Sequence, residues 1–324
     1  MSLALRLAVL LALLAGCAPR APSEPFVDSR TPPGLPGRFM APEGWAWGVI
    51  QVGDAPGQRY GVSSPASVPT GQVVVVPAYG DAAEAWFETV RDLNAAGLTV
   101  WVLDRAGQGG SGRFTSPRDL GHVPSFEPDV RSLEAFVRQV VHAPADQRVT
   151  ILAHGDGAVV ALLALENRLD VDGLVLEAPR TARPKDVQVV SGLAAWLRLD
   201  ARPPPGWRPW TRRDRPLDRA QVLAAWQLVN PDLRMAGPSL GWRRAFFEAS
   251  RSALAGASTV KVPTIASGAE EGPSPCPVLA ACRLISPARR STAPHRAEDA
   301  DRTPWLAEVA AFAHTGAMEA PHGS

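Results

Sequence analysis

The chain of 324 residues carries 33 basic and 32 acidic side chains, so its formal net charge is +1. Hydrophobic residues make up 46% of it and charged residues 20%, a composition that indicates a folded globular protein and excludes an intrinsically disordered one. Binding to nucleic acid depends on clustered positive charge, so a nearly neutral chain predicts no nucleic-acid partner.

The first 17 residues have the pattern of a bacterial export signal. Arg6 supplies a short basic region, and the apolar run 7–14 is too short to span a bilayer. The run ends in Leu-Ala-Gly-Cys at 14–17, which resembles the lipobox of bacterial lipoproteins. The resemblance implies cleavage before Cys17 and acylation of its thiol, so that the lipid bilayer is a partner and the protein is an exported, membrane-anchored lipoprotein of the cell envelope. An ordinary signal peptide with a chance cysteine is the alternative. Ala18 stands where an inner-membrane retention aspartate would, which favours the outer membrane facing the periplasm.

Residues 18–44 are rich in proline and in small or polar residues. This composition predicts an extended tether that holds the folded domain away from the membrane. The domain itself is expected at 45–180 and 255–316, with residues 181–254 inserted as a lid.

Two further cysteines, Cys276 and Cys282, lie near the C-terminal end. An exported location permits a disulfide between them, but six residues of separation suit a bridge only if the intervening turn folds back. The sequence therefore leaves open whether Cys276 and Cys282 form a disulfide or remain free thiols. Neither cysteine has a neighbouring histidine, so we expect no zinc site.

Strand and helix patterns alternate through the body of the chain. Val73–Val76 is an unbroken β-branched run, as expected of a strand buried on both faces. The alternation predicts an α/β fold with a mostly parallel, doubly wound sheet, in which ligands bind at the carboxyl ends of the strands. Strands are expected near 45–52, 59–62, 73–76, 98–103, 149–153, 171–177 and 259–266, and helices near 82–96, 128–141, 158–167 and 305–313.

The long segment between the last two strands contains half of the ten tryptophans: Trp196, Trp207, Trp210, Trp226 and Trp242. A tryptophan-rich insertion at the active edge of a sheet favours a lid over an apolar pocket. The alternative is that the rings only pack the insertion against itself.

Four short motifs, together with this strand order, resemble α/β-hydrolases of the bacterial lysophospholipase and monoacylglycerol-lipase group, a serine aminopeptidase-like group. The motifs are Val-Pro-Ala-Tyr at 76–79, Leu-Asp-Arg-Ala-Gly-Gln-Gly-Gly-Ser-Gly at 103–112, Gly-His-Val at 121–123 and Gly-Pro-Ser-Leu-Gly-Trp at 237–242. The resemblance runs from about Trp45 to the C-terminal helix. It implies an α/β-hydrolase fold with an inserted helical lid and carboxylic-ester hydrolysis as the family activity. The sequence has no glycine-rich phosphate loop of recognised form and no metal-ligand cluster, so we expect no cofactor.

The resemblance implies a nucleophilic serine at a tight turn between a strand and a helix, flanked by small residues, as enzymes of this group share. The matching segment here is Ala-His-Gly-Asp-Gly-Ala at 153–158, which places Gly155 at the nucleophile position. Glycine has no nucleophile, so this position is vacated.

Asp156 is the nearest side chain that could replace the serine, by forming an ester intermediate. That role requires the turn to slip by one residue and to place the bulky His154 where a small residue is needed. The alternative is a solvent-facing aspartate whose charge suits the first turn of a helix.

The resemblance also implies the other members of a catalytic triad. Glu271 falls on the position of the catalytic acid, in the loop after strand 259–266, and His295 falls on that of the base. Arg296 stands where the family has a glutamate, and the segments flanking His295 are short. An ordinary loop histidine is therefore the alternative for His295.

Backbone N–H groups of Ala78 or Tyr79 and of Asp156 are the expected oxyanion hole, which can survive a change of side chains. His122 and His154 match family positions without a chemical role, so we expect hydrogen-bonded structural residues. Asp104 is expected to anchor the glycine-rich turn at 107–112.

Two functions follow. The first is a membrane-anchored, catalytically inactive or degenerate member of the family, with a binding or interaction role for a lipid-like ligand. The second is an active ester hydrolase, using Asp156 or a serine such as Ser111 or Ser239, on lysophospholipids, monoacylglycerols or other carboxylic esters.

Overall fold

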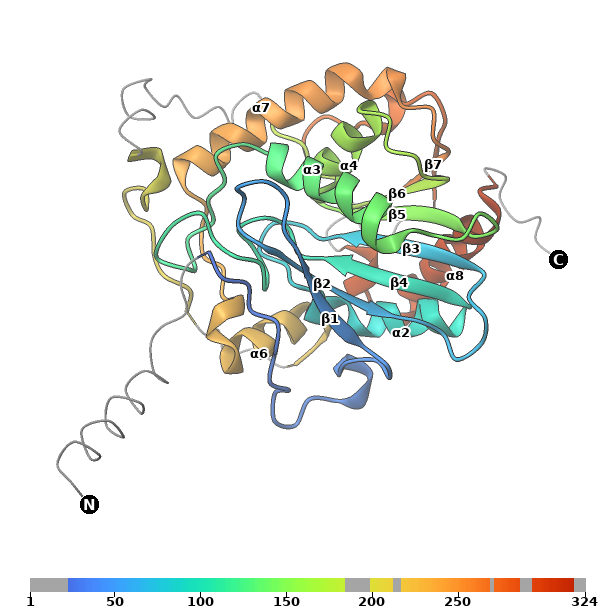
Figure 1. Ribbon diagram of the computed structural model, residues 1–324, viewed down its shortest axis with the longest axis horizontal. Helices are drawn as coiled ribbons and strands as arrows, with labels where there is room; N and C mark the ends of the chain where they lie inside the picture. Colours follow the sequence, from blue (N-terminus) through green and yellow to red (C-terminus); the bar gives the residue numbers. More distant parts are fainter. Residues whose placement is uncertain (1–22, 184–198, 212–216, 269–270, 286–292, 318–324) are drawn as a thin grey trace.

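The computed structural model describes residues 23–183, 199–211, 217–268, 271–285 and 293–317. Within them, one eight-stranded sheet has the order β1-β2-β4-β3-β5-β6-β7-β8 (Figure 1). β1 and β2 pair antiparallel, β2 pairs antiparallel with β4, and the remaining neighbours are parallel. The strands are β1 (Ala46–Ile50), β2 (Gln58–Ser63), β3 (Gly71–Val76), β4 (Leu98–Leu103), β5 (Arg148–His154), β6 (Gly173–Glu177), β7 (Thr264–Ser267) and β8 (Cys282–Leu284).

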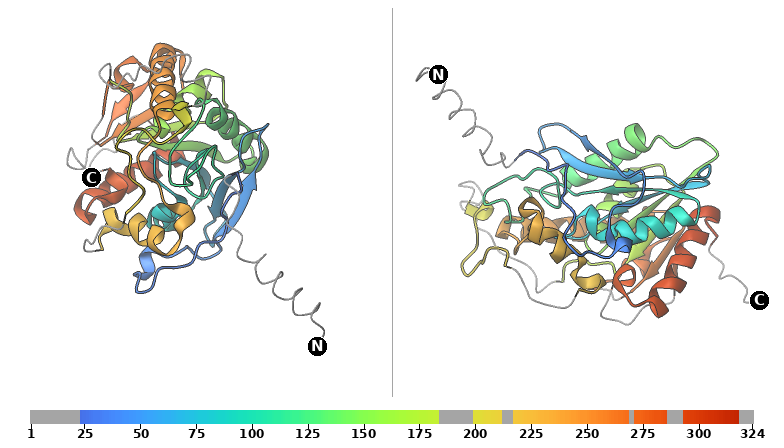
Figure 2. Two further views of the ribbon diagram at one scale, coloured as in Figure 1. Left: turned by 90° about the vertical axis from the view of Figure 1, so that its left-hand side faces the viewer. Right: turned by 90° about the horizontal axis from the view of Figure 1, so that it is seen from below.

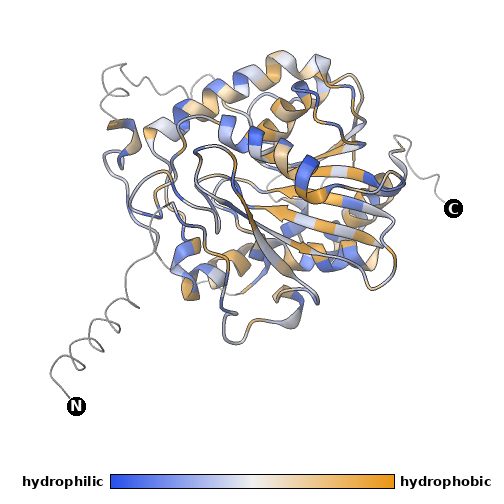
Figure 3. Ribbon diagram, in the orientation of Figure 1, coloured by the Kyte–Doolittle hydropathy of each residue, from blue (hydrophilic) through white to orange (hydrophobic). Residues whose placement is uncertain are grey.

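Helices cover both faces of this sheet. α3 (Glu127–Phe136), α4 (Gly157–Glu166) and α7 (Leu240–Gly256) pack on one face, and α2 (Phe87–Ala95) and α8 (Asp299–Thr315) on the other (Figure 1). Alternate residues of β3 serve the two layers: Val74 and Val76 contact the first, and Val73 and Val75 the second. The parallel strands are accordingly largely hydrophobic (Figure 3). The doubly wound sheet predicted from the sequence is confirmed.

Two details of the sheet differ from prediction. The strand expected at 259–266 begins only at Thr264, because residues 257–259 form a turn of 3₁₀-helix. The edge strand β8 was not predicted. Cys282 opens it and is disulfide-bonded to Cys276, with 5.4 Å between the Cα atoms, which decides the alternative that the sequence left open.

Residues 23–44 do not form the predicted free tether. Leu35 and Phe39 are buried against Trp226 of the insertion, and Asn230 exchanges two hydrogen bonds with the backbone of Arg30, at 2.7 and 2.9 Å. Burying each of the two apolar side chains stabilises the packed arrangement by about 2 kcal/mol. The described part of this segment is therefore a strap bound to the domain; residues 18–22 lie outside the described residues.

The predicted insertion is shorter than residues 181–254. α7 packs on α4 and belongs to the main core through Trp242, Phe246 and Ala253, so the inserted part ends at about Ser239. Its helix α6 (Val222–Val229) lies across the carboxyl edge of the sheet from α7; the left view of Figure 2 looks onto this edge. Trp226 and Trp242 are buried in hydrophobic cores, whereas Trp210 lines a cavity, so the five tryptophans do not share one role. Trp196 lies outside the described residues.

None of the described helices is both long and apolar enough to cross a bilayer. The export signal and Cys17 lie outside the described residues.

Candidate functional site: a vacated nucleophile elbow

The turn between β5 and α4 has the backbone shape of a nucleophile elbow. β5 ends at His154 and α4 begins at Gly157, which leaves two residues for a sharp reversal. Gly155 has φ +55°, in the left-handed region where side chains are strained. A Cβ on Gly155 would lie 2.8 Å from the Cβ of Ala78, closer than real contacts allow. The predicted nucleophile position is therefore at the elbow, and its surroundings have closed over the missing side chain.

Asp156 is neither a solvent-facing residue nor an accessible nucleophile. The residue is 1% exposed; its Oδ1 accepts the backbone N–H of Tyr79 at 2.8 Å, and its Oδ2 accepts a hydrogen bond from Arg105 Nη1 at 2.5 Å. Burial alone would raise the pKa of this carboxyl, but Arg105 and the Tyr79 N–H hold the pKa below its ordinary value. Asp156 is thus a buried, ionised carboxylate, and the prediction of a solvent-facing side chain is wrong. Its contacts to Tyr79 and Arg105 argue against the alternative role as a nucleophile.

A second buried carboxylate completes the surroundings of Arg105. Asp129 Oδ2 lies 3.3 Å from Arg105 Nη2, and Asp129 Oδ1 accepts the N–H of Ala106 at 2.6 Å. The guanidinium also stacks on Phe126, with 4.9 Å to the ring centre. Arg105 therefore links the elbow to α3 through an ion network that is closed to solvent.

The network changes the predicted oxyanion hole. An oxyanion hole needs backbone N–H groups directed at the place where negative charge develops. The N–H of Tyr79 already serves the carboxylate of Asp156, and Ala78 packs against Gly155. An internal anion thus occupies one of the donors that the sequence assigns to a reaction intermediate.

His295 is buried at the same edge of the sheet. Its ring stacks on Trp86, with 4.0 Å between ring centres, and its Nδ1 lies 2.7 Å from Oε1 of Glu177. Arg296 Nε lies 3.0 Å from Nε2 of His295, and because a guanidinium only donates, Nε2 is the acceptor and Nδ1–H donates to Glu177. Burial, with the charge of Arg296, keeps the pKa of His295 well below its ordinary value. His295 is accordingly a neutral histidine with both ring nitrogens engaged, and not an ordinary loop residue.

The acid that contacts His295 is Glu177, not Glu271. Glu177 ends β6 and is fully buried, whereas the side chain of Glu271 is 61% exposed and pairs with Arg180 at 3.3 Å. Burial raises the pKa of the Glu177 carboxyl above its ordinary value, although His154 and the backbone N–H of His295 act against the shift. The predicted role of Glu271 is corrected accordingly.

Neither alternative serine is an open nucleophile. Ser111 Oγ donates to the carbonyl of Asp104 at 2.8 Å and accepts the N–H of Arg59 at 3.0 Å. Ser239 Oγ accepts the N–H of Trp242 at 3.0 Å as the N-cap of α7 and lies 2.8 Å from His122 Nδ1. Both serine residues have 0% exposure.

Comparisons with known proteins identify the family and the fold. The family model described as "Serine aminopeptidase, S33" matches residues 67–272, from the start of the parallel sheet to the loop after β7. The chain belongs to this family. Its sequence is 31% identical over 215 residues to proteins named lysophospholipase L2 from two strains of Escherichia coli, K12 and O6:H1, over 61% of this chain and 63% of theirs. The match thus covers less than two thirds of the length of these relatives.

Solved structures show the same α/β-hydrolase fold. A monoglyceride lipase from Saccharomyces cerevisiae aligns with TM-score 0.62 and 16% identity over 87% of this chain and all of its own. A carboxyl esterase from Bacillus coagulans aligns with TM-score 0.61 and 14% identity over 84% of this chain and 98% of its own. At such identities the likeness establishes the fold and no more.

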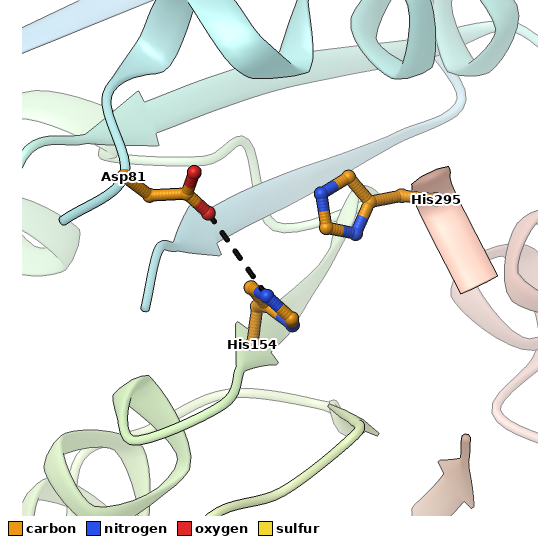
Figure 4. A group of neighbouring side chains, drawn as sticks. All are labelled: Asp81, His154 and His295. Atoms are coloured by element: carbon orange, nitrogen blue, oxygen red, sulfur yellow. Dashed lines mark ion pairs between the residues drawn. The ribbon is translucent and has the colours of Figure 1, made fainter. Parts of the chain in front are cut away.

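Three side chains of this S33-family chain could each offer one atom to a metal ion: Asp81, His154 and His295, whose ligand atoms lie within 4.8 Å of one another (Figure 4). Two ligands of one zinc ion lie about 3.5 Å apart or closer, whereas Asp81 Oδ2 and His154 Nε2 are 4.0 Å apart. The guanidinium of Arg296 bonds both Asp81 and His295 and so supplies a cation there. The three side chains therefore form a polar cluster around the guanidinium of Arg296. That the protein binds no metal ion remains a prediction.

The structural roles predicted for other polar residues are confirmed. His154 Nδ1 lies 3.2 Å from the carbonyl of Glu177, and His122 bonds Ser239. Asp104 accepts the N–H of Gly110 at 2.8 Å, which anchors the glycine-rich turn, and it also binds the buried Arg59.

Three site residues had no predicted role: Asp81, Arg105 and Glu177. Glu177 carried a usable signal, because it is a charged residue at the carboxyl end of a buried strand, where ligands and catalytic groups gather. Arg105 follows the end of β4 in the same way. Asp81 lies in the loop after β3, and nothing in its local sequence distinguishes it from a turn residue.

Proposed function

We propose that the protein is a membrane-anchored member of the family that binds a lipid-like ligand under its insertion and does not hydrolyse it. The observation that carries the proposal is the elbow itself: Gly155 replaces the nucleophile, and the carboxylate of Asp156 takes the Tyr79 N–H. Each change removes a different part of acyl-transfer chemistry.

The magnitudes support an inactive site. Loss of the serine from a comparable triad costs on the order of a million-fold in turnover. Loss of one oxyanion donor costs about another 100-fold to 1,000-fold. A negative charge at that donor also opposes the charge that would develop during attack on an ester.

The retained His295–Glu177 pair does not restore chemistry. A general base needs a free lone pair within reach of the proton that it removes. The free lone pair of His295 is on Nε2, and Arg296 donates to it.

A cavity beside this site offers the binding function. It has a volume of about 600 Å³, in the range of small-molecule sites, and lies between α6, residues 208–211 and residues 235–237 of the insertion. Ala236, which lines the cavity, accepts a hydrogen bond at its carbonyl from the hydroxyl of Tyr79 at 2.8 Å.

The anchoring part of the proposal rests on Cys17 and on the position of the strap. Ser23 lies against Gly112, and the N–H of Phe26 donates to the carbonyl of Gly110 at 2.6 Å, both on the loop that follows β4. Residues 18–22 span at most about 20 Å even when fully extended. An acylated Cys17 would therefore hold the carboxyl edge of the sheet, with its cavity, close to the bilayer.

One experiment tests binding and hydrolysis together. The purified full-length protein is incubated with a lysophospholipid and with a monoacylglycerol, and bound lipid and released fatty acid are measured in the same sample. We expect retained, intact lipid and no release above a protein-free blank. Catalytic release of fatty acid would contradict the proposal and favour an ester hydrolase, the function that the names of the relatives suggest.

A further inference from the structure

The cavity under the insertion has two arginines and, among the described residues that line it, no acidic side chain. Arg208, which is exposed, and Arg296, whose side chain is partly buried, both line it. Arg208 is exposed and makes no ion pair with any described residue. Among the described residues, therefore, no acidic side chain in the cavity lining balances the two positive charges.

Only part of the Arg296 guanidinium is bonded to other residues of the protein. Its Nε donates to His295, one Nη nitrogen binds Asp81 behind the cavity, and its side chain remains 26% exposed. The second Nη nitrogen has no hydrogen-bond partner among the described residues. Asp81 balances one of the two positive charges, which leaves an excess of one.

Apolar side chains contribute part of the cavity lining. They include Trp210, Leu223 and Met235. Trp210 donates its backbone N–H to Asp119 and its indole N–H to Gln227, each at 2.8 Å, so its ring cannot turn away without losing the bond to Gln227. An indole ring and two guanidinium groups in the lining of one cavity suit a molecule with an apolar chain and an anionic head.

We propose that this cavity binds a single-chain amphiphile with an anionic head, a carboxylate or a phosphate, whose head pairs with Arg208 and Arg296 and whose chain lies on Trp210. The inference deepens the proposed function and rests on it. Guanidinium groups bind both head groups through charge-assisted, often bidentate hydrogen bonds, which a neutral glycerol head cannot make. The protein then selects ligands by head charge.

The test compares amphiphiles of equal chain length on the full-length protein: dodecanoate, lauroyl lysophosphatidate, monolauroylglycerol and lauroyl lysophosphatidylcholine, with inorganic phosphate alone as a further probe. Binding is followed by tryptophan fluorescence below the micelle concentration. We expect the two anionic amphiphiles to bind at least about tenfold more tightly than the neutral and zwitterionic ones, and phosphate alone to bind far more weakly.

Substitutions assign the head-group contacts. Arg208→Gln should weaken binding of the anionic amphiphiles about tenfold and leave monolauroylglycerol unchanged. Arg202→Gln, an exposed arginine of the same insertion outside the cavity lining, should change neither affinity. Arg296→Gln should act like Arg208→Gln, and because Arg296 also contacts Asp81 and His295, the Arg208 variant decides the question if the Arg296 variant is unstable.

Three other outcomes would each contradict the inference, and they differ in what they imply for the proposed function. Equal affinity for monolauroylglycerol and dodecanoate would remove charge selection and leave the binding proposal intact. Tight binding of phosphate alone would indicate a free-anion site. Binding of no amphiphile would overturn both the inference and the proposed function.

Discussion

The carboxylate of Asp156 accepts the backbone N–H of Tyr79 at 2.8 Å, across the gap between the carboxyl ends of β3 and β5. The same carboxylate is held by the buried guanidinium of Arg105. The carboxylate of Asp156 therefore lies at the place where an active enzyme of this fold would stabilise the negative charge of a reaction intermediate. This contact and Gly155 are the two features on which the proposal of an inactive site rests.

Replacing Asp156 should cost substantial stability. Asp156→Asn leaves Arg105 buried with only the longer contact to Asp129, and breaking a buried ion pair costs about 3 kcal/mol. We expect that loss in the free energy of unfolding measured by chemical denaturation. The exposed Asp146→Asn is the control and should change stability by less than about 0.5 kcal/mol. Equal stability of the two variants would show that Arg105 does not depend on Asp156.

Restoring the serine alone should not restore hydrolysis. Gly155→Ser places a Cβ 2.8 Å from the Cβ of Ala78 at a positive φ, so we expect a stability loss of about 2 kcal/mol and no turnover of short-chain esters. Adding Ala78→Gly removes the steric conflict and should recover part of the stability. It should still give no turnover, because Asp156 remains on the Tyr79 N–H. Family-like turnover by Gly155→Ser would show that the rest of the triad is intact.

Stability should fall as the solution is acidified from pH 7.5 to 5.5. Burial holds the pKa values of His154 and His295 below 6.5, so in this window the unfolded chain binds protons that the folded chain does not. Each such histidine removes up to about 1.4 kcal/mol per pH unit below 6.5. Glu177, whose pKa is raised, acts in the opposite sense and reduces the net slope. Asp81 and Arg296 are the other charged groups that face the two rings.

Two matched variants measure how much the imidazole of His295 contributes to this pH dependence. His295→Gln should flatten the dependence of the unfolding free energy on pH by about 1 kcal/mol over this range. His142→Asn, an exposed position with φ 37° that asparagine tolerates, should leave the slope unchanged. A parallel dependence in the wild-type chain and His295→Gln would mean that His295 titrates normally.

Membrane attachment should depend on Cys17. Cys17→Ser should either release the protein into the soluble fraction or leave the signal uncleaved, because acylation and cleavage both require the thiol. Fractionation and the mass of the N-terminal peptide report the two cases. Wild-type protein found unmodified in the cytoplasm would exclude the lipoprotein hypothesis.

The fold was predictable because its signals are local. The run Val73–Val76 identifies a strand buried on both faces, and the small residues around Gly155 identify the elbow. The edge strand β8 has only three residues with a partly exposed pattern, so periodicity does not distinguish it from a loop. In the strap, the two buried residues Leu35 and Phe39 are separated by Pro36, Gly37 and Arg38, and a proline-rich composition gives no sign that they are buried.

The site was less predictable because its pairings are tertiary. Glu177 and Glu271 follow neighbouring strands, and the sequence does not tell which carboxylate reaches His295. Asp156 looks like a normal first-turn acid until Arg105, 51 residues away, is placed beside it. Sequence thus located the edge and the vacated position, and the three-dimensional contacts decided the role of each charge.

Labelling of the wild-type protein with a fluorophosphonate tests the central claim most directly, because the reagent forms a stable adduct only with an activated serine. Intact-mass spectrometry of the purified full-length protein after prolonged exposure should show the unlabelled mass, with Gly155 at the elbow and with Ser111 and Ser239 buried. A related esterase that carries the elbow serine, treated in parallel, should be fully labelled. A stoichiometric adduct on any serine of this chain would contradict the account.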